Sequence, residues 1–259
     1  MFKQRASIYN QNKMICNNGF LQNILINKSE KYYHTTEFNN MMIDNKPVIN
    51  VLPNDCLEIA QLFITNGYNP TVLNMADVSF PGGGIEMGGY AQEESLFCRS
   101  NYFKTLNLQT GLYPINGAEC IYSKNVFVFR DTNLNFLDKP FYVSFIACAA
   151  IKEPELLSKN FTQNDYDMTF KKIELIFQTA FLKGHNCLIL SAFGCGAYKN
   201  PKHQIAEIFN KLIGIYGHLF KFIIFAILPK NDMVNKYICK QNDDCNYSFF
   251  SNNISNTQV

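Results

Sequence analysis

The chain has 259 residues, of which 47% are hydrophobic, and it carries a formal net charge of +2. This length predicts one large domain, or one domain with an extension, with ample material for a core. No long run of Lys and Arg is present, so the dense basic face of a duplex-binding protein is not expected. No apolar run approaches the roughly 18 residues of a membrane-spanning helix.

An irregular N-terminal segment precedes a regular pattern of strands and helices. Residues 1–45 are rich in Asn, Lys and Tyr, and they predict an extension with one helix around residues 19–26. The apolar residues 48–52 then predict a strand. A helix should follow it, with Asn54 or Asp55 as the cap of its first turn.

The middle of the chain contains signals for a strand, a loop, a helix and a hairpin. Residues 71–75 are apolar and β-branched, which predicts a strand, and a glycine-rich loop follows. A helix should begin at Gln92, where apolar residues recur at helical spacing. Residues 120–129 predict a hairpin that turns at residues 123–124, and residues 141–147 predict a long buried strand.

The last third of the chain continues this alternation. Residues 165–182 predict an amphipathic helix, and residues 187–190 predict a buried strand before a second glycine loop. A helix at residues 201–216 and a strand at residues 222–227 complete the pattern. From about residue 240 the chain is rich in Asn and Ser, which predicts a loose tail.

The order of these elements indicates the fold class. Strands that alternate with helices and are continuously apolar are typical of a largely parallel sheet covered on both faces. In such α/β folds, ligands bind at loops beyond the carboxyl ends of the strands. Two glycine-rich loops occupy this position, at residues 81–91 and 191–198. The sequence therefore predicts an α/β protein with a ligand site at these loops.

The first loop joins three consecutive glycines, Gly82, Gly83 and Gly84, to the adjacent acids Glu93 and Glu94. Glycines let a ligand approach backbone amides without meeting a Cβ. The dinucleotide fingerprint and the phosphate loop that ends in Gly-Lys-Ser/Thr are both absent. Acids at the start of a helix also stabilise the helix dipole by about 0.3–1 kcal/mol each, which is the structural alternative. Together with the glycines, however, they indicate an enzyme for a nucleotide-like substrate.

The second loop contains Gly194, Cys195, Gly196, Ala197 and Tyr198 between a strand and a helix. Successive amides in such a loop, together with the amino end of a helix, are typical of a diphosphate site. The structural alternative is a tight turn that binds no ligand. Two such loops at one sheet favour the interpretation as a ligand-binding site over that of a simple turn.

Cysteine and histidine are spaced too irregularly for a metal site. The nine cysteines and four histidines are scattered, and neither CxxC nor HExxH occurs. We therefore expect no metal and no cofactor. The polar N-terminus lacks the pattern of a secretory leader, so reduced thiols in an intracellular protein, cytoplasmic or nuclear, are expected.

Residues 73–100 are similar to the poly(ADP-ribose) glycohydrolases, above all to the shorter, microbial type. The specific motif is the triple glycine followed, after seven residues, by Gln-Glu-Glu. Residues 127–131 and 191–200 resemble further stretches of that family, and the whole resemblance covers about residues 48–230. It implies a macrodomain-like three-layer sandwich, in which a mixed, largely parallel sheet lies between helices, plus an N-terminal extension.

The resemblance also implies roles for single residues. Glu94 stands where the family has its catalytic acid, and Glu93 stands where it has a ribose anchor. The implied substrate-binding residues are Asp77, Gly82, Gly83, Gly84, Gln92, Gly194, Cys195, Gly196, Ala197 and Tyr198. Cleavage of a ribose–ribose bond needs a proton on the leaving oxygen and stabilisation of an oxocarbenium-like sugar. Glu94 can supply that proton if burial or the charge of Glu93 raises its pKa.

The implied activity is release of ADP-ribose from poly(ADP-ribose), mainly from the chain end. The alternatives are a hydrolase of mono-ADP-ribosylated targets and a non-catalytic ADP-ribose-binding module, although binding alone does not need both glutamates. Expected partners are poly(ADP-ribose) or ADP-ribosylated proteins as substrate and ADP-ribose as product, with no membrane and no sequence-specific nucleic acid. We expect a monomer with an N-terminal extension (1–45), a glycohydrolase core (46–240) and a flexible polar tail (241–259).

Overall fold

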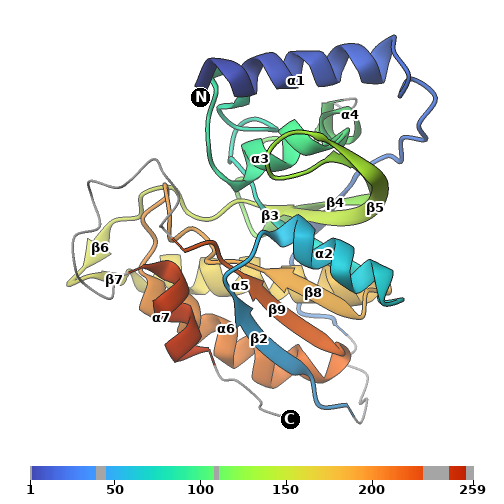
Figure 1. The fold of residues 1–259 in the computed structure, drawn as a ribbon. Helices are drawn as coiled ribbons and strands as arrows, with labels where there is room; N and C mark the ends of the chain where they lie inside the picture. Colours follow the sequence, from blue (N-terminus) through green and yellow to red (C-terminus); the bar gives the residue numbers. More distant parts are fainter. Residues whose placement is uncertain (1, 39–44, 108–110, 230–244, 255–259) are drawn as a thin grey trace. The chain divides into compact units, whose positions relative to one another are not determined.

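The computed structural model divides the chain into two compact units (Figure 1). It describes residues 2–38, 45–107, 111–229 and 245–254. Unit 1 comprises Met1–Tyr33 and Leu73–Ala149, and unit 2 comprises His34–Val72 and Ala150–Val259. The chain passes from unit 2 into unit 1 along the strand β3 (Pro70–Met75).

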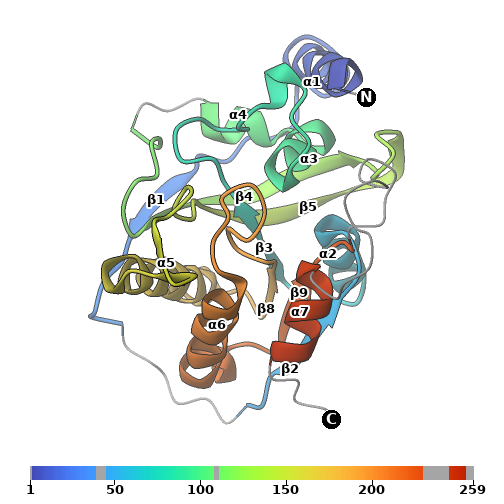
Figure 2. The same ribbon diagram turned by 90° about the vertical axis from the view of Figure 1, so that its left-hand side faces the viewer.

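Unit 1 is an antiparallel sheet with helices packed on one side. Its elements are α1 (Phe2–Asn17), β1 (Glu30–Tyr33), the short 3-10 helix η1 (Ile85–Met87), α3 (Gln92–Arg99), α4 (Tyr102–Asn107), β4 (Glu119–Arg130) and β5 (Phe136–Cys148). β4 pairs antiparallel with both β1 and β5. Figures 1 and 2 show α1, α3 and α4 on the same side of β4 and β5. Ile121, Val128 and Phe145 of this sheet have no exposed surface, so they belong to the core of the unit.

Unit 2 is built on a parallel sheet. Its other elements are β2 (Val48–Leu52), α2 (Cys56–Thr65), β6 (Leu156–Leu157), β7 (Asn160–Phe161), α5 (Gln163–Leu182), β8 (Cys187–Leu190), α6 (Lys202–Tyr216), η2 (Gly217–Leu219), β9 (Phe222–Ala226) and α7 (Asn246–Asn253). The sheet order is β3-β8-β9-β2, and each neighbouring pair is parallel. α5 and α6 cover one face of this sheet and α2 covers the other (Figure 2). β8 is buried along its whole length, as a strand covered on both faces should be.

Local signals set most elements of unit 2 where the sequence predicts them. The side chain of Asp55 accepts hydrogen bonds from the N–H groups of Leu57 and Glu58, which fixes the start of α2. Thr162 caps α5 in the same way through the N–H of Asp165. The predictions for β2, α2, β3, α5, β8, α6 and β9 are confirmed to within a few residues.

The prediction of a helix around residues 19–26 is wrong. The helix lies earlier, at α1, and residues 18–24 form turns closed by bonds such as that from the N–H of Asn18 to the carbonyl of Met14. The helical pattern is weak in the sequence because α1 buries polar Arg5 and Asn12 together with its apolar side chains. Tertiary packing against unit 1, more than an apolar stripe, therefore holds α1.

The prediction of a hairpin at residues 120–129 is also wrong. These residues form one continuous strand, β4, which pairs with β5 over most of its length. The pairing register shifts between Ser123 and Val126, and Asn125 adopts a left-handed φ of 50°. The polar residues 123–125 therefore form a bulge in a long strand instead of a turn.

The predicted helix that starts at Gln92 ends at Arg99, and a second helix, α4, begins at Tyr102. Ser100 ends α3 by donating from Oγ to the carbonyl of Leu96 over 2.6 Å, and it forms a bridge with Val128 of β4. Asn101 exchanges two hydrogen bonds with Phe127, through its own N–H and its Oδ1. The pairing of residues 100–101 with β4 separates α3 from α4. The local sequence contains no signal that predicts this interruption.

The predicted loose tail is wrong for the residues of α7. Phe250 is fully buried, with its ring centroid 6.5 Å from that of Phe209 and 6.0 Å from that of Phe225. This contact supplies the apolar burial that orders an otherwise polar helix. Residues 241–244 and 255–259 of the predicted tail lie outside the described residues. The division into extension, core and tail stays a prediction.

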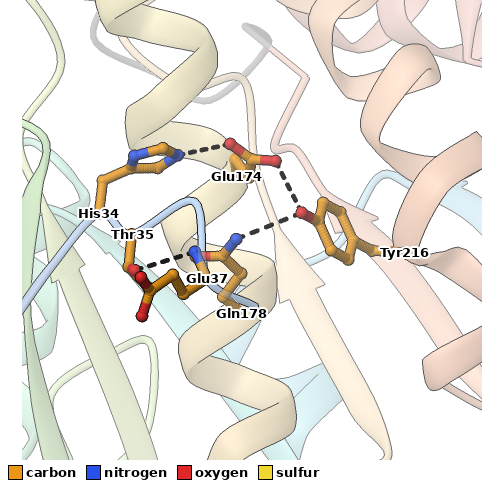
Figure 3. A network of polar contacts seen from close by, with 6 residues as sticks. All are labelled: His34, Thr35, Glu37, Glu174, Gln178 and Tyr216. Carbon is orange, nitrogen blue, oxygen red and sulfur yellow. Dashed lines mark hydrogen bonds and ion pairs between the residues drawn. The ribbon is translucent and has the colours of Figure 1, made fainter. Parts of the chain in front are cut away.

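A polar network joins the segment after β1 to the helices of unit 2 (Figure 3). His34 Nε2 lies 2.5 Å from Glu174 Oε2 on α5, and the hydroxyl of Tyr216 donates to Glu174 Oε1 over 2.7 Å. Gln178 Nε2 donates in turn to the hydroxyl of Tyr216. Part of the predicted N-terminal extension is thereby built into unit 2.

Candidate active site

The predicted first loop connects the carboxyl end of β3 to the start of α3 in unit 1. Asp77 begins it with a turn, in which Oδ1 accepts hydrogen bonds from the N–H groups of Ser79 (2.8 Å) and Phe80 (3.1 Å). The carboxylate of Asp77 is thus used in shaping the entry to the glycines. The backbone N–H of Asp77 donates to Glu93.

Glu93 is buried and accepts several hydrogen bonds, one of them from the backbone of Gly82. Its Oε1 accepts from Asn74 Nδ2 (3.1 Å) and the hydroxyl of Tyr113 (3.4 Å), and its Oε2 accepts from the N–H of Asp77 (2.8 Å). Burial raises the pKa of Glu93 to about 7, and the charge of Glu94 adds a smaller upward effect against these hydrogen bonds. Glu93 therefore exchanges a proton near neutral pH.

Glu94 closes the glycine loop. Its Oε1 accepts from the N–H of Gly84 and its Oε2 accepts from the N–H of Ala91, both over 3.0 Å. The second bond satisfies one of the free N–H groups at the start of α3. Glu94 is 8% exposed, so its carboxyl group is held between the two ends of the loop with little access to water.

Gly89 shows why this loop needs glycine. A Cβ at position 89 would lie 2.7 Å from Glu94 Oε1, a separation that real Cβ contacts do not reach. The backbone of Gly89 therefore passes so close to the carboxyl group that any side chain would displace it.

Gln92 ties α3 to β3. Its Oε1 accepts from the N–H of Met75 over 2.8 Å, and its Nε2 donates to the carbonyl of Leu73 over 2.7 Å. The amide thus continues the hydrogen bonding of the strand and fixes the helix that carries both acids. A direct contact of Gln92 with substrate stays a prediction.

The predicted second loop leaves the carboxyl end of β8 in unit 2. Tight turns shape it, with bonds from the N–H of Cys195 to the carbonyl of Ala192 and from the N–H of Asn200 to the carbonyl of Gly194. Its tip, Gly196 and Ala197, is exposed, as a site for a ligand requires.

Asn200 fixes this loop from inside. Its Nδ2 donates to the carbonyls of Ile151 (2.7 Å) and Tyr198 (3.0 Å). Gly194 has a φ of +72°, and a Cβ there would lie 2.7 Å from Asn200 Cγ and from Ala150 Cβ. A side chain at position 194 would therefore meet both backbone strain and a clash.

No metal centre accompanies the loops. In the part of the chain that the structure describes, no group of three or more His, Cys, Asp and Glu side chains could hold a metal ion. Burial raises the pKa of Cys195 to about 12, so this thiol stays protonated and is a poor nucleophile. Within the described ranges, no helix is long and apolar enough to span a bilayer.

Within unit 1 the structure brings together the predicted residues of the first loop, and within unit 2 it brings together those of the second loop. The sequence prediction missed Asn74 and Tyr113 as partners of Glu93, and Asn200 as the support of the second loop. Asn74 is a polar residue within an otherwise apolar strand, which is a signal available in the sequence. Tyr113 and Asn200 carry no comparable local signal.

The fold and the site define a macrodomain-like α/β protein with a glutamate pair behind a glycine loop. Residues 4–131 match the family model described as microbial-type PARG, catalytic domain. The resemblance to the microbial-type poly(ADP-ribose) glycohydrolases that the sequence predicts is thereby confirmed for these residues. The match includes most of α1, the glycine loop and both glutamates. A search of the curated proteins found no significant match.

Solved structures of poly(ADP-ribose) glycohydrolases share the fold. The enzyme from Thermomonospora curvata is 20% identical, with a TM-score of 0.79 over 97% of this chain and 100% of that chain. A structure of that enzyme with the inhibitor ADP-HPD gives a TM-score of 0.75 at 21% identity, over 96% and 99% of the two chains. The enzyme from Deinococcus radiodurans, in complex with ADP-ribose, is 22% identical, with a TM-score of 0.62 over 73% and 79%. The predicted macrodomain-like α/β fold is confirmed, and the N-terminal extension stays a prediction.

Proposed function

We propose that the chain hydrolyses ribose–ribose O-glycosidic bonds of poly(ADP-ribose) and releases ADP-ribose. The observation that carries this proposal is the position of Glu94, a buried carboxyl group fixed by two N–H groups where the glycine loop meets α3. The family match over residues 4–131 supports the same substrate class.

In the proposed reaction Glu94 protonates the oxygen of the leaving ribose as the bond to the anomeric carbon breaks. The leaving unit departs with a free hydroxyl group, and Glu94 becomes a carboxylate. It then removes a proton from the water that attacks the oxocarbenium-like sugar, which restores the acid. Glu93 holds a ribose hydroxyl, and Asn74 and Tyr113 fix its orientation.

The two glycine loops supply the binding part of the proposal. Gly82, Gly83 and Gly84 offer backbone amides to the distal ribose and diphosphate, and residues 194–198 offer theirs to the diphosphate. We further propose cleavage mainly from the chain end, with poly(ADP-ribose) or ADP-ribosylated proteins as substrates of an intracellular, cytoplasmic or nuclear monomer.

Release of ADP-ribose from purified poly(ADP-ribose) tests the activity. We expect Glu94→Gln to lower the rate by about 10²–10⁴-fold while binding of ADP-ribose is kept. Glu155→Gln is the matched control. Glu155 is an exposed acid in unit 2 that directly precedes β6, so this variant should keep the native rate.

Two results would overturn the proposal. A folded native protein that binds ADP-ribose but releases none from the polymer is a binding module. If the protein releases ADP-ribose from a mono-ADP-ribosylated protein but not from the polymer, it is a hydrolase of mono-ADP-ribosylated targets. The length of the products over time tests the chain-end preference, because cleavage inside the polymer yields oligomers first.

A further inference from the structure

A buried cation of α1 stacks on the loop that holds Glu94, within unit 1. The guanidinium carbon of Arg5 lies 3.8 Å from the ring centroid of Tyr90, and Arg5 is 7% exposed. Its Nη1 has no hydrogen-bond partner among the described residues. Burial of a charge is costly without compensation, so the ring face is an important partner for this cation.

Tyr90 is adjacent to the hydrogen bond that fixes Glu94. The peptide unit between Tyr90 and Ala91 carries the N–H that donates to Glu94 Oε2 over 3.0 Å. The Tyr90 side chain is 54% exposed, so packing from other side chains restrains it only in part. The stack on Arg5 therefore limits rotation of the peptide unit whose N–H orients the carboxyl group.

Arg5 can restrain the loop because α1 is itself fixed on α3 and β4. Asn12 Nδ2 donates to the carbonyl of Cys98 over 2.7 Å, and Arg130 Nε donates to Asn12 Oδ1 over 2.9 Å. Both bonds are buried, so they hold the helix in register. Lys13 adds an ion pair to Glu86 over 3.2 Å, but Glu86 is exposed and the pair contributes little.

We propose that Arg5 is a positioning residue for Glu94 and acts through its stack on Tyr90. This inference rests on the proposed function, since it concerns the geometry of the proposed acid. In this role Arg5 acts without touching the substrate or the reacting atoms. It fixes the backbone that fixes the carboxyl group, so its loss should lower kcat and leave KM nearly unchanged.

Four variants separate this role from a general effect on folding. Arg5→Ala and Tyr90→Ala each remove the stack, Arg5→Lys keeps the charge without the planar group, and Tyr90→Phe keeps the ring. We expect Arg5→Ala and Tyr90→Ala each to lower kcat by about tenfold, and Tyr90→Phe to behave as the native protein. The double variant should lose no more than either single one, because both remove the same contact.

Amide hydrogen exchange at Ala91 gives a readout that does not depend on turnover. Arg5→Ala should speed exchange there at least as much as it lowers kcat, while the amides of β4 keep their native rates. If the native protein proves inactive on every substrate, this measurement still tests the stack on its own.

The proposal is overturned by unchanged kcat and unchanged exchange at Ala91 in folded Arg5→Ala, even if its melting temperature falls. Additive losses in the double variant would overturn it as well. Should Arg5→Ala fail to fold, Tyr90→Ala decides the matter, because the half-exposed Tyr90 can be replaced without opening the core.

Discussion

The two glycine loops are held in place by different chemistry, each within its own unit. In the first loop, the carboxyl groups of Glu93 and Glu94 accept backbone N–H groups, and both acids are buried. In the second loop, the neutral amide of Asn200 donates to two carbonyls, and the tip of the loop is exposed. The first loop is ordered by carboxyl acceptors, of which Glu93 has a raised pKa, and the second loop is ordered by a neutral amide donor.

This difference suggests a division of labour. A loop whose own supports can exchange protons suits acid–base chemistry, but its order depends on pH. A loop supported by an amide keeps its shape over the same pH range and suits recognition of a diphosphate. Variants of the first loop should therefore change kcat and pH dependence, and variants of the second should change KM.

The largest expected effect concerns the titration of Glu93. Its folded-state pKa of about 7 lies above the ordinary value of 4.5, so the native state holds a proton that the unfolded state releases between these values. Its contribution to stability is full below pH 4.5 and is lost as the pH rises through 7. The loss is on the order of 3 kcal/mol.

Glu93→Gln cannot titrate, so this part of the pH dependence should vanish. Chemical denaturation of the native protein and the variant at about pH 5 and about pH 8 measures it. Glu155→Gln is the control for removal of an acid. Equal pH dependence in all three proteins would show that both loops are ordered without titrating groups.

A second expected effect is on catalysis. Gly89→Ala places a Cβ 2.7 Å from Glu94 Oε1, so the carboxyl group must move. A displacement of about 1 Å costs about a hundredfold in rate, and we expect that loss in kcat with little change in KM. Gly117→Ala is the matched control in unit 1, since a Cβ there meets nothing within 4 Å. Native kcat in folded Gly89→Ala would contradict the assignment of Glu94.

The smallest effect is expected from the second loop. Gly194→Ala combines strain at a φ of +72° with a clash against Asn200, and it should raise KM by about tenfold while kcat is kept. Gly214→Ala on α6 is the control, because its Cβ has open space. Steady-state kinetics on poly(ADP-ribose) measure both. A fall in kcat with unchanged KM would remove the distinction between the loops.

Much of the fold was predictable because its signals are local. The Asp55 cap and the apolar run of residues 187–190 mark α2 and β8 directly. The misplaced elements depend on contacts distant in sequence. Residues 123–125 become a bulge only because β5 pairs along them, and α1 is helical in spite of its buried polar residues.

The site shows the same limit. The triple glycine stands out in the sequence because it fits neither a helix nor a strand, and the Glu93-Glu94 pair follows it closely. Their supports do not stand out. Tyr113 reaches Glu93 from 20 residues away, and Arg5 reaches Tyr90 from the first helix, so only the folded chain reveals them.

The position of β2 has a consequence for how the protein is made. This edge strand pairs with β9, and Val48 lies opposite Phe222. The pair can therefore form only after Phe222 has been synthesised. During synthesis, an apolar strand and the amphipathic α2 leave the ribosome long before their partners do. Contacts between residues so far apart in sequence form slowly, and the strand edge stays unpaired until they do. Fragments that stop before β9, including one limited to residues 4–131, should therefore aggregate or require a chaperone.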